Sequence, residues 1–317
     1  MSASLNLTSA AAFRDYVEDM GDQLIAQGFY GFKTADYMTV HEGVKGKKIL
    51  TSLMVNDLAR RWAKQFNAPL DTIVFAPREL NVEFAKVELE IYPQDFESTY
   101  LGKKRKKGQG MDIPFEGDIM MQVMKKLAQE LDIATIQGVK AATPASTDLL
   151  KQLYHGLLKL ITDLIAAGHA PYVVAGGALT TANIMTVVRD MQDGIGEAYK
   201  EGDLEIYMSL VNMNKYFDAH VTKYQGIKPQ VRFVNGVKQT RTEDESGWII
   251  GLPSWKNSNR ICVTPPGNFH LGYDDIVDWQ SFNFKDDIRS IKFWMDFKMG
   301  VQIFLAEESA FMVNNLA

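Results

Sequence analysis

Apolar residues recur every three to four positions in four stretches of the chain, which is the spacing of one face of an α-helix. This pattern predicts helices over about residues 9–27, 117–137, 148–167 and 180–199. Gly138 follows the second stretch and can end that helix. Ser146 or Thr147 can cap the third helix, and Thr180 or Thr181 the fourth.

Between the first two helices the pattern is less regular. A broken stripe over residues 49–66 predicts a further helix, and it consists of Leu53, Leu58 and Trp62. The spacing then changes to two, with one parity in Leu80, Val82 and Phe84 and the other in Val87, Leu89 and Ile91. A change of parity within one extended segment indicates a bulge or bend, here near Ala85–Lys86.

The second half of the chain alternates helical and extended patterns. Short buried strands are predicted over residues 171–175 and 206–211, and two more around a turn within 248–264. Near the C-terminus, apolar residues alternate on both sides of Gly300, which predicts a hairpin around Lys298–Gly300. The segment up to Cys262 has the α/β pattern of one compact unit, and the fold class expected for the whole chain is α+β.

Composition narrows the class of protein. The 317 residues include 46% hydrophobic and 23% charged side chains, which is typical of a globular protein of about two domains. No apolar run approaches the ~20 residues of a membrane span, and we expect no secretory signal at the N-terminus. Cys262 is the only cysteine, so neither an intramolecular disulfide nor a zinc site built from cysteines is expected, and the setting is a reducing compartment.

The strongest indication of an enzyme is the glycine pair Gly176–Gly177, which follows a predicted strand and precedes a predicted helix. Such a turn can bind phosphate at a helix N-terminus. The surrounding residues match neither a dinucleotide-binding nor a P-loop motif, so a tight turn without a ligand is the simpler interpretation.

No catalytic, cofactor or metal site is predicted. The histidines stand at positions 41, 155, 169, 220 and 270, without the close spacing of metal ligands. We expect structural roles for His155, on the third helix, and for Cys262, in an apolar strand. Asp274–Asp275 and Asp286–Asp287 could bind a cation, although acidic pairs in polar loops are usually solvated.

Five consecutive basic residues stand out in a chain of net charge −5: Lys103, Lys104, Arg105, Lys106 and Lys107. They are either a solvated loop or a contact with nucleic-acid phosphates or with an acidic surface of a neighbouring chain. No aromatic residue interrupts the run, so sequence-specific nucleic-acid recognition is not expected.

The order of these elements resembles the tailed-phage major capsid proteins with the Hong Kong 97-like shell fold. The C-terminal third carries most of the resemblance, in segments 251–253, 261–264, 267–269 and 272–275 and in the final strands 288–305. The segments LEIYPQDFESTYLG and IYMSLVNMNKYF are most similar to capsid proteins of the crAss-like phages.

The resemblance implies five regions, which are an N-terminal arm (1–44), an extended loop (45–84), a peripheral domain with a long spine helix (85–141), an axial domain (142–264) and the C-terminal part of the peripheral domain (265–317). It also implies self-assembly into hexamers and pentamers that form an icosahedral shell around double-stranded DNA. Portal and auxiliary or decoration proteins would be partners, without a membrane or a cofactor. The location would be the virion, assembled in the cytoplasm of a bacterial host.

Two alternatives remain open. One is an encapsulin-type compartment, which shares the fold and encloses cargo enzymes in place of DNA. The other is a soluble α/β enzyme that binds phosphate at Gly176–Gly177. The apolar residues of the extended loop favour a shell, because a projecting loop has little core of its own and must cover a neighbouring subunit.

Overall fold

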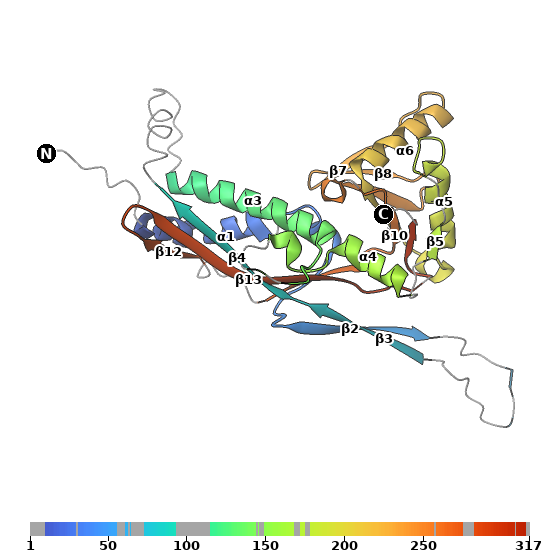
Figure 1. Cartoon of the computed structure of the whole chain (residues 1–317). Coiled ribbons are helices and arrows are strands. Elements are labelled where there is room, and N and C mark those ends of the chain that lie inside the picture. The colour runs from blue at the N-terminus through green and yellow to red at the C-terminus, as the bar shows by residue number, and fades with distance from the viewer. Residues whose placement is uncertain are drawn as a thin grey trace.

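The computed structural model describes residues 10–29, 31–55, 61–62, 64, 73–92, 115–143, 145, 149–167, 172–174, 178–256, 258–274, 282–307 and 309–314. Two packed units and a projecting two-stranded ribbon make up these residues (Figure 1). The first unit holds the long helix α3, and the second holds α5 and α6. No helix among the described residues is long and apolar enough to cross a membrane.

The first unit is built on a five-stranded sheet. Its strands are β1 (Thr39–His41), β4 (Glu83–Ile91), β11 (Phe269–Tyr273), β12 (Asn283–Asp286) and β13 (Ile291–Ile303). The central strand is β13, which pairs with β4 along one edge and with β12 and then β11 along the other. Segments 200 or more residues apart in the chain therefore share one sheet, as in the pair Ile91↔Ile291.

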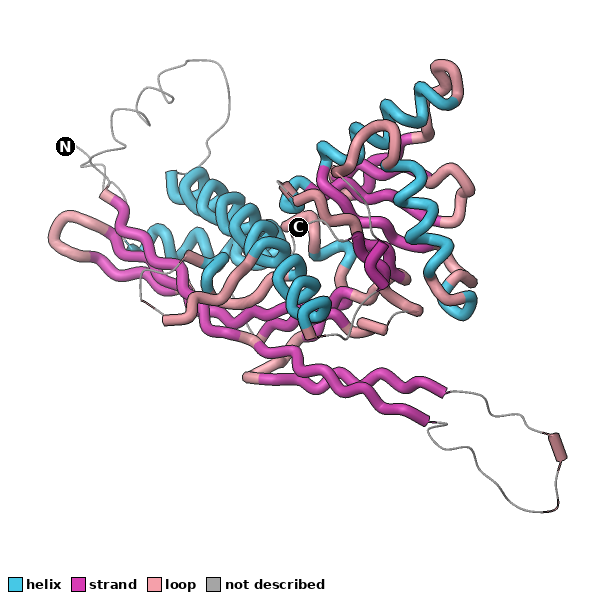
Figure 2. Tube along the Cα trace, turned by 45° about the vertical axis from the view of Figure 1, so that its right-hand side comes forward, coloured by secondary structure: helices cyan, strands magenta, loops and turns pink. Residues whose placement is uncertain are grey.

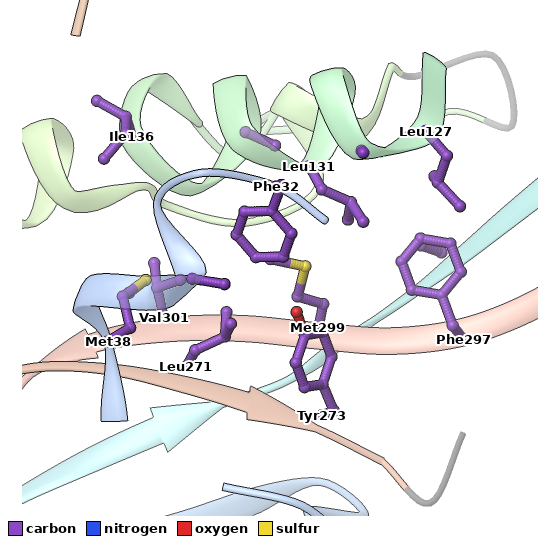
Figure 3. Packing of buried hydrophobic residues seen from close by; sticks show 14 of the residues in the cluster. Phe32, Met38, Leu127, Leu131, Ile136, Leu271, Tyr273, Phe297, Met299 and Val301 are labelled. Atoms are coloured by element: carbon purple, nitrogen blue, oxygen red, sulfur yellow. The ribbon is translucent and has the colours of Figure 1, made fainter. Parts of the chain in front are cut away.

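Helices α1 (Ala10–Phe29) and α3 (Phe115–Gln137) cover one face of this sheet. In the apolar stripe of α3, Leu127 and Leu131 are buried and Ile119 and Val123 are half-buried, and α3 ends immediately before Gly138. Figure 3 shows Leu127, Leu131 and Ile136 above side chains of β13 and β11. Gly28 lies where the two helices touch, since a Cβ there would be 2.8 Å from the Met124 sulfur.

The predicted hairpin around Lys298–Gly300 is wrong, because β13 runs without interruption from Ile291 to Ile303. The odd-numbered side chains are buried throughout the strand, so the parity does not change at Gly300. Gly300 instead permits close packing, since a Cβ at this position would lie 1.8 Å from the Asn81 carbonyl oxygen. A glycine inside a strand here marks the approach of another backbone.

The helix predicted within 49–66 is also wrong for its first part, which is strand β2 (Lys47–Val55). Leu50 and Ser52 are buried while Ile49 and Leu53 are exposed, which is the period of two of a strand. Strand β3 (Ile73–Asn81) pairs with β2 over its whole length. Residues 56–60, 63 and 65–66 lie outside the described residues.

The predicted change of parity exists, but not near Ala85–Lys86. Strands β3 and β4 are separated at Val82, and the pairing of β4 with β13 continues through Ala85 and Lys86 without a bulge. At this break the Val82 N–H donates to the Gly46 carbonyl, 2.9 Å away, and so closes the base of the ribbon.

The helix predicted over 148–167 begins later, as α4 (Leu157–Ala166), after the short 3-10 helix η2 (Leu150–Gln152). The backbone is held at Gly156, whose N–H donates to the Gly138 carbonyl at 2.8 Å. A Cβ on Gly156 would lie 2.6 Å from the Gly138 nitrogen, so this crossing interrupts the helix. The proposed caps, Ser146 and Thr147, lie outside the described residues.

The second unit is a seven-stranded sheet in the order β5-β14-β10-β6-β9-β8-β7. Its strands are β5 (Tyr172–Val174), β6 (Leu204–Ser209), β7 (Val231–Val234), β8 (Val237–Arg241), β9 (Gly247–Leu252), β10 (Cys262–Thr264) and β14 (Met312–Asn314). The pairing of β14 with β5 and β10 returns the chain end to this sheet. The predicted boundary at residue 265, in contrast, groups β14 with the first unit.

Helices α5 (Ile184–Gly194) and α6 (Leu210–Lys223) pack on this sheet and form its own apolar core. Three shorter 3-10 helices complete the described elements: η1 (Ala35–Tyr37), η3 (Glu197–Tyr199) and η4 (Pro253–Trp255). The predicted helix start at Thr180 is wrong, because the Asn183 side chain accepts from the Thr180 N–H at 2.8 Å and forms a turn that delays α5.

Candidate assembly surface

The ribbon of β2 and β3 projects from the first unit (Figure 2). Its two strands pair antiparallel from Lys47↔Asn81 at the base to Val55↔Ile73. At the base, the Val44 N–H donates to the Tyr273 carbonyl at 2.7 Å, and Gln302 Nε2 donates to the Glu79 carbonyl at 2.7 Å. The ribbon is therefore fixed at its root by β11 and β13.

The two faces of the ribbon differ. Leu50, Ser52 and Leu80 lie on one face and are buried. The opposite face presents Ile49, Leu53 and Phe75, which are 58%, 56% and 65% exposed. We call these three residues, with Thr51 and Pro77 between them, the ribbon face.

The register concentrates the apolar side chains of the ribbon face. Leu53 pairs directly with Phe75, and Thr51 pairs with Pro77, so these side chains are cross-strand neighbours on one surface. An isolated two-stranded ribbon is at best marginally stable in water. An exposed apolar surface of this kind is typical of a contact with another molecule.

The root of the ribbon packs so closely on β11 and β13 that there is no room for side chains at the positions directly beneath it. Gly272 and Gly300 are paired across β11 and β13. A Cβ on Gly272 would lie 3.0 Å from a methyl of Leu80, and Gly300 lies under Asn81. These two glycines allow the ribbon to cross the sheet in direct backbone contact. A glycine inside a strand often marks a close approach of another backbone, so these two glycines were the feature of the sequence that could have predicted this crossing.

Lys298 connects the root to the sheet electrostatically. Its ammonium pairs with the Asp274 carboxylate, donates to the Lys45 carbonyl at 3.0 Å and lies 4.5 Å from the centre of the Phe84 ring. The charge is largely shielded from solvent, with side chains of Lys298 and Asp274 that are 15% and 21% exposed. Sequence reasoning considered Asp274 only as a cation ligand and missed this ion pair.

The other predicted site residues fall into two groups. The basic run from Lys103 to Lys107 and the glycine pair Gly176–Gly177 lie outside the described residues. The described acidic candidates have protein partners, since Asp286 accepts from the Ala10 N–H at 2.7 Å and Asp287 pairs with Lys292 at 2.6 Å. Within the described part of the chain no group of three or more potential metal ligands occurs.

His155 is partly exposed, whereas Cys262 is buried. His155 precedes α4 and is not on that helix, contrary to the prediction, and its Nδ1 accepts from the Lys140 N–H at 3.2 Å. Cys262 is buried in β10, as the apolar pattern predicts, and burial raises the pKa of its thiol far above the ordinary value. The structure also brings together His41 and His270, which sequence spacing could not connect.

Comparisons with known proteins concern the structure alone, since no family model and no curated protein matches the sequence. The structure is similar to that of the satellite phage P4 procapsid (TM-score 0.56, 11% identity, 94% of this chain and 98% of that chain). It is also similar to the capsid of the native GTA particle (TM-score 0.57, 12% identity, 89% and 88%). A third similar structure is the SrpI encapsulin of Synechococcus elongatus PCC 7942 (TM-score 0.51, 10% identity, 88% and 85%). The chain therefore has the Hong Kong 97-like capsid fold that the order of its elements predicts.

Proposed function

We propose that this chain is a tailed-phage major capsid protein that assembles with copies of itself into a closed shell. The observation that carries the proposal is the ribbon face, an apolar surface on a projecting arm of a chain that has a capsid fold. In this proposal the ribbon face of one subunit packs on the neighbouring subunit.

Energetics support a partner for the ribbon face. Full burial of one large apolar side chain contributes about 1.5–3 kcal/mol. Ile49, Leu53 and Phe75 are each more than half exposed, so most of this free energy is unused in the isolated chain. Repetition of the same contact around a shell would couple each subunit to its neighbour.

The finer proposal follows the resemblance of the sequence. The subunits form hexamers and pentamers of an icosahedral shell around double-stranded DNA, with portal and auxiliary proteins as further partners. The five-region division and the placement near the crAss-like phages belong to this proposal. So does the location, in a virion assembled in the bacterial cytoplasm.

The basic run Lys103–Lys107 is proposed to contact an acidic surface of a neighbouring subunit or the phosphates of packaged DNA. Five adjacent positive charges on an acidic chain support this role. Salt screens such contacts, so replacement of the four lysines with glutamine should reduce the salt dependence of assembly. An unchanged salt dependence would exclude the role.

An encapsulin-type compartment remains the second candidate, because one of the similar structures is an encapsulin. The content of purified particles distinguishes the two, since a phage capsid encloses nucleic acid and an encapsulin encloses protein cargo. The enzyme alternative has less support, because α5 begins at Ile184 and not directly after the glycine pair that was expected to bind phosphate.

Deletion of the outer ribbon tests the proposal. Residues 51–77 are removed and Leu50 is joined to its partner Arg78 by Asn-Gly, a two-residue turn suited to a hairpin. Lys48, Leu80 and the hydrogen bond between Gly46 and Val82 remain. We expect a folded subunit in circular dichroism that forms no closed shells in negative-stain electron microscopy.

Two results would contradict this expectation. An unfolded subunit would show that the ribbon belongs to the core of its own chain. Closed particles of normal size would show that the ribbon face does not join subunits.

A further inference from the structure

Two side chains close in sequence and a third that is distant form a hydrogen-bonded row at the root of the ribbon. Nε2 of His41, in β1, lies 2.7 Å from Nδ1 of His270, in β11. Nζ of Lys48, in β2, lies 2.9 Å from Nδ1 of His41. The row therefore joins the first strand of the ribbon to the five-stranded sheet.

The chemistry of the row fixes the protonation state of both imidazoles. An ammonium can only donate, so His41 Nδ1 must accept from Lys48. His41 Nε2 then carries the proton and donates to His270 Nδ1, which must be unprotonated. Both rings are neutral in this arrangement, and a proton on either acceptor nitrogen removes one of the two hydrogen bonds.

The surroundings offer little to stabilise an added charge. His270 is buried, and its ring lies 5.0 Å from that of Phe304. Gln302 pairs with His270 across the sheet and is neutral, and the Gly267 carbonyl is the neighbour that favours a charged His270. Of the nearby carboxylates, Glu42 is exposed and Glu79 pairs with Lys47 at 2.9 Å.

We propose that Lys48, His41 and His270 form an acid-sensitive latch, which fastens the ribbon root to the sheet while both imidazoles are neutral and releases it when either is protonated. Protonation of His41 places two positive charges, the imidazolium and Lys48, at hydrogen-bonding distance. Protonation of His270 places an N–H against the N–H of His41 inside a buried site. The inference concerns the single chain and does not depend on shell assembly.

The pH range over which the latch should release follows from the lowered pKa values of His41 and His270. Burial, then the proximity of His41 and Lys48, lowers the pKa of His270 to about 4, despite the opposing effect of the Gly267 carbonyl. Burial and Lys48 also lower the pKa of His41. A released histidine titrates near its ordinary pKa of about 6.5. The released form therefore binds more protons between about pH 6.5 and pH 4, and the latch weakens as the pH falls through this range.

Hydrogen exchange of the full-length chain tests the latch. We expect the backbone amides of residues 44–50 to lose protection roughly tenfold between pH 7 and pH 5, after correction for the intrinsic exchange rate. The double variant His41→Gln/His270→Gln retains hydrogen-bonding groups without the titration and should lose this pH dependence. His220→Gln on α6 is the matched control and should behave as the unmodified chain.

Lys48→Gln provides an independent variant if the double variant fails to fold. Removal of the ammonium takes away a charge that lowers the pKa values of both histidines in the latched form. Those pKa values then move toward that of the released form, so the loss of protection between pH 7 and pH 5 should become smaller. Protection of residues 44–50 that does not change between pH 7 and pH 5 in the unmodified chain would overturn the proposal. An equal pH dependence in the folded double variant would also overturn it.

Discussion

Two antiparallel strand pairs of the same length meet near Val82 and differ in what covers them. The ribbon pairs β2 with β3 over nine residue pairs, and β4 pairs with β13 over nine residue pairs as well. Helices α1 and α3 cover the inner face of β4 and β13, where Phe293 and Met295 are buried. The ribbon extends away from that cover (Figure 1).

The outward faces of the two pairs show the difference more clearly. The outward face of β4 and β13 pairs Lys86 with Asp296 and Glu90 with Lys292, which suits contact with water. The ribbon face, which is also outward, carries Leu53 opposite Phe75. The outward face of β4 and β13 is therefore mostly charged, although Phe84 is also exposed on it, whereas the outer part of the ribbon face is apolar.

Replacement of a core aromatic should have the largest effect. Phe293 is buried and packs against Phe282 and Phe284, with ring centres 5.8 Å and 5.1 Å away. Phe293→Ala should lower the free energy of unfolding by about 3–5 kcal/mol, measured by urea denaturation of the unassembled subunit. Phe75→Ala should change it by less than about 1 kcal/mol. Similar losses in both variants would mean that the ribbon and the sheet share one core.

Polar substitutions on the ribbon face should affect assembly and leave folding unchanged. Leu53→Ser/Phe75→Ser should raise the protein concentration required for assembly about tenfold or more, because about 1.5–3 kcal/mol of burial per side chain is lost. Light scattering against concentration measures this threshold. Ile288→Ser is the matched control, since Ile288 is 94% exposed and lies outside the ribbon. A threshold that moves equally in the control would show a nonspecific effect of surface hydrophobicity.

The smallest effects should come from two ion pairs of different exposure. Lys298 and Asp274 are largely shielded, whereas Lys47 and Glu79 on the ribbon are 60% and 51% exposed. Lys298→Met should destabilise the subunit by about 1–2 kcal/mol, because it removes the charged partner of a shielded carboxylate. Lys47→Met should cost at most about 0.5 kcal/mol. Thermal unfolding compares the two, and a larger loss at Lys47 would contradict this account of the ribbon.

Much of the secondary structure could be predicted from local patterns. The stripe of α3, its end before Gly138 and the buried strand of Cys262 follow from side chains close in sequence, and the structure confirms them. The predictions fail where a contact with a segment distant in sequence determines the secondary structure. The local pattern around Gly300 predicted a turn. In the structure, β13 is continuous at Gly300, and the backbone of Asn81 crosses it there. Gly156 ended no predicted element, yet its contact with Gly138 sets the start of α4.

The candidate surface was predicted in outline and not in detail. The sequence indicated an apolar excursion too large for a free loop, and the structure shows a ribbon with an exposed face in that region. Which residues are exposed depends on the pairing register, because direct pairs place Leu53 and Phe75 on the same face. The helical stripe expected for Leu53 assigned it to the wrong kind of element.

Periodicity and turn residues act over a few positions, so the order of elements and the resemblance to the Hong Kong 97-like fold could be predicted from local patterns. The pairing of the strands, the glycines at which backbones cross and the contacts between polar groups depend on the packing of distant segments. Lys48, His41 and His270 illustrate the reason, since 229 positions separate the two histidines that lie 2.7 Å apart. Such a contact depends on the packing of three strands onto one another, and no local pattern records it.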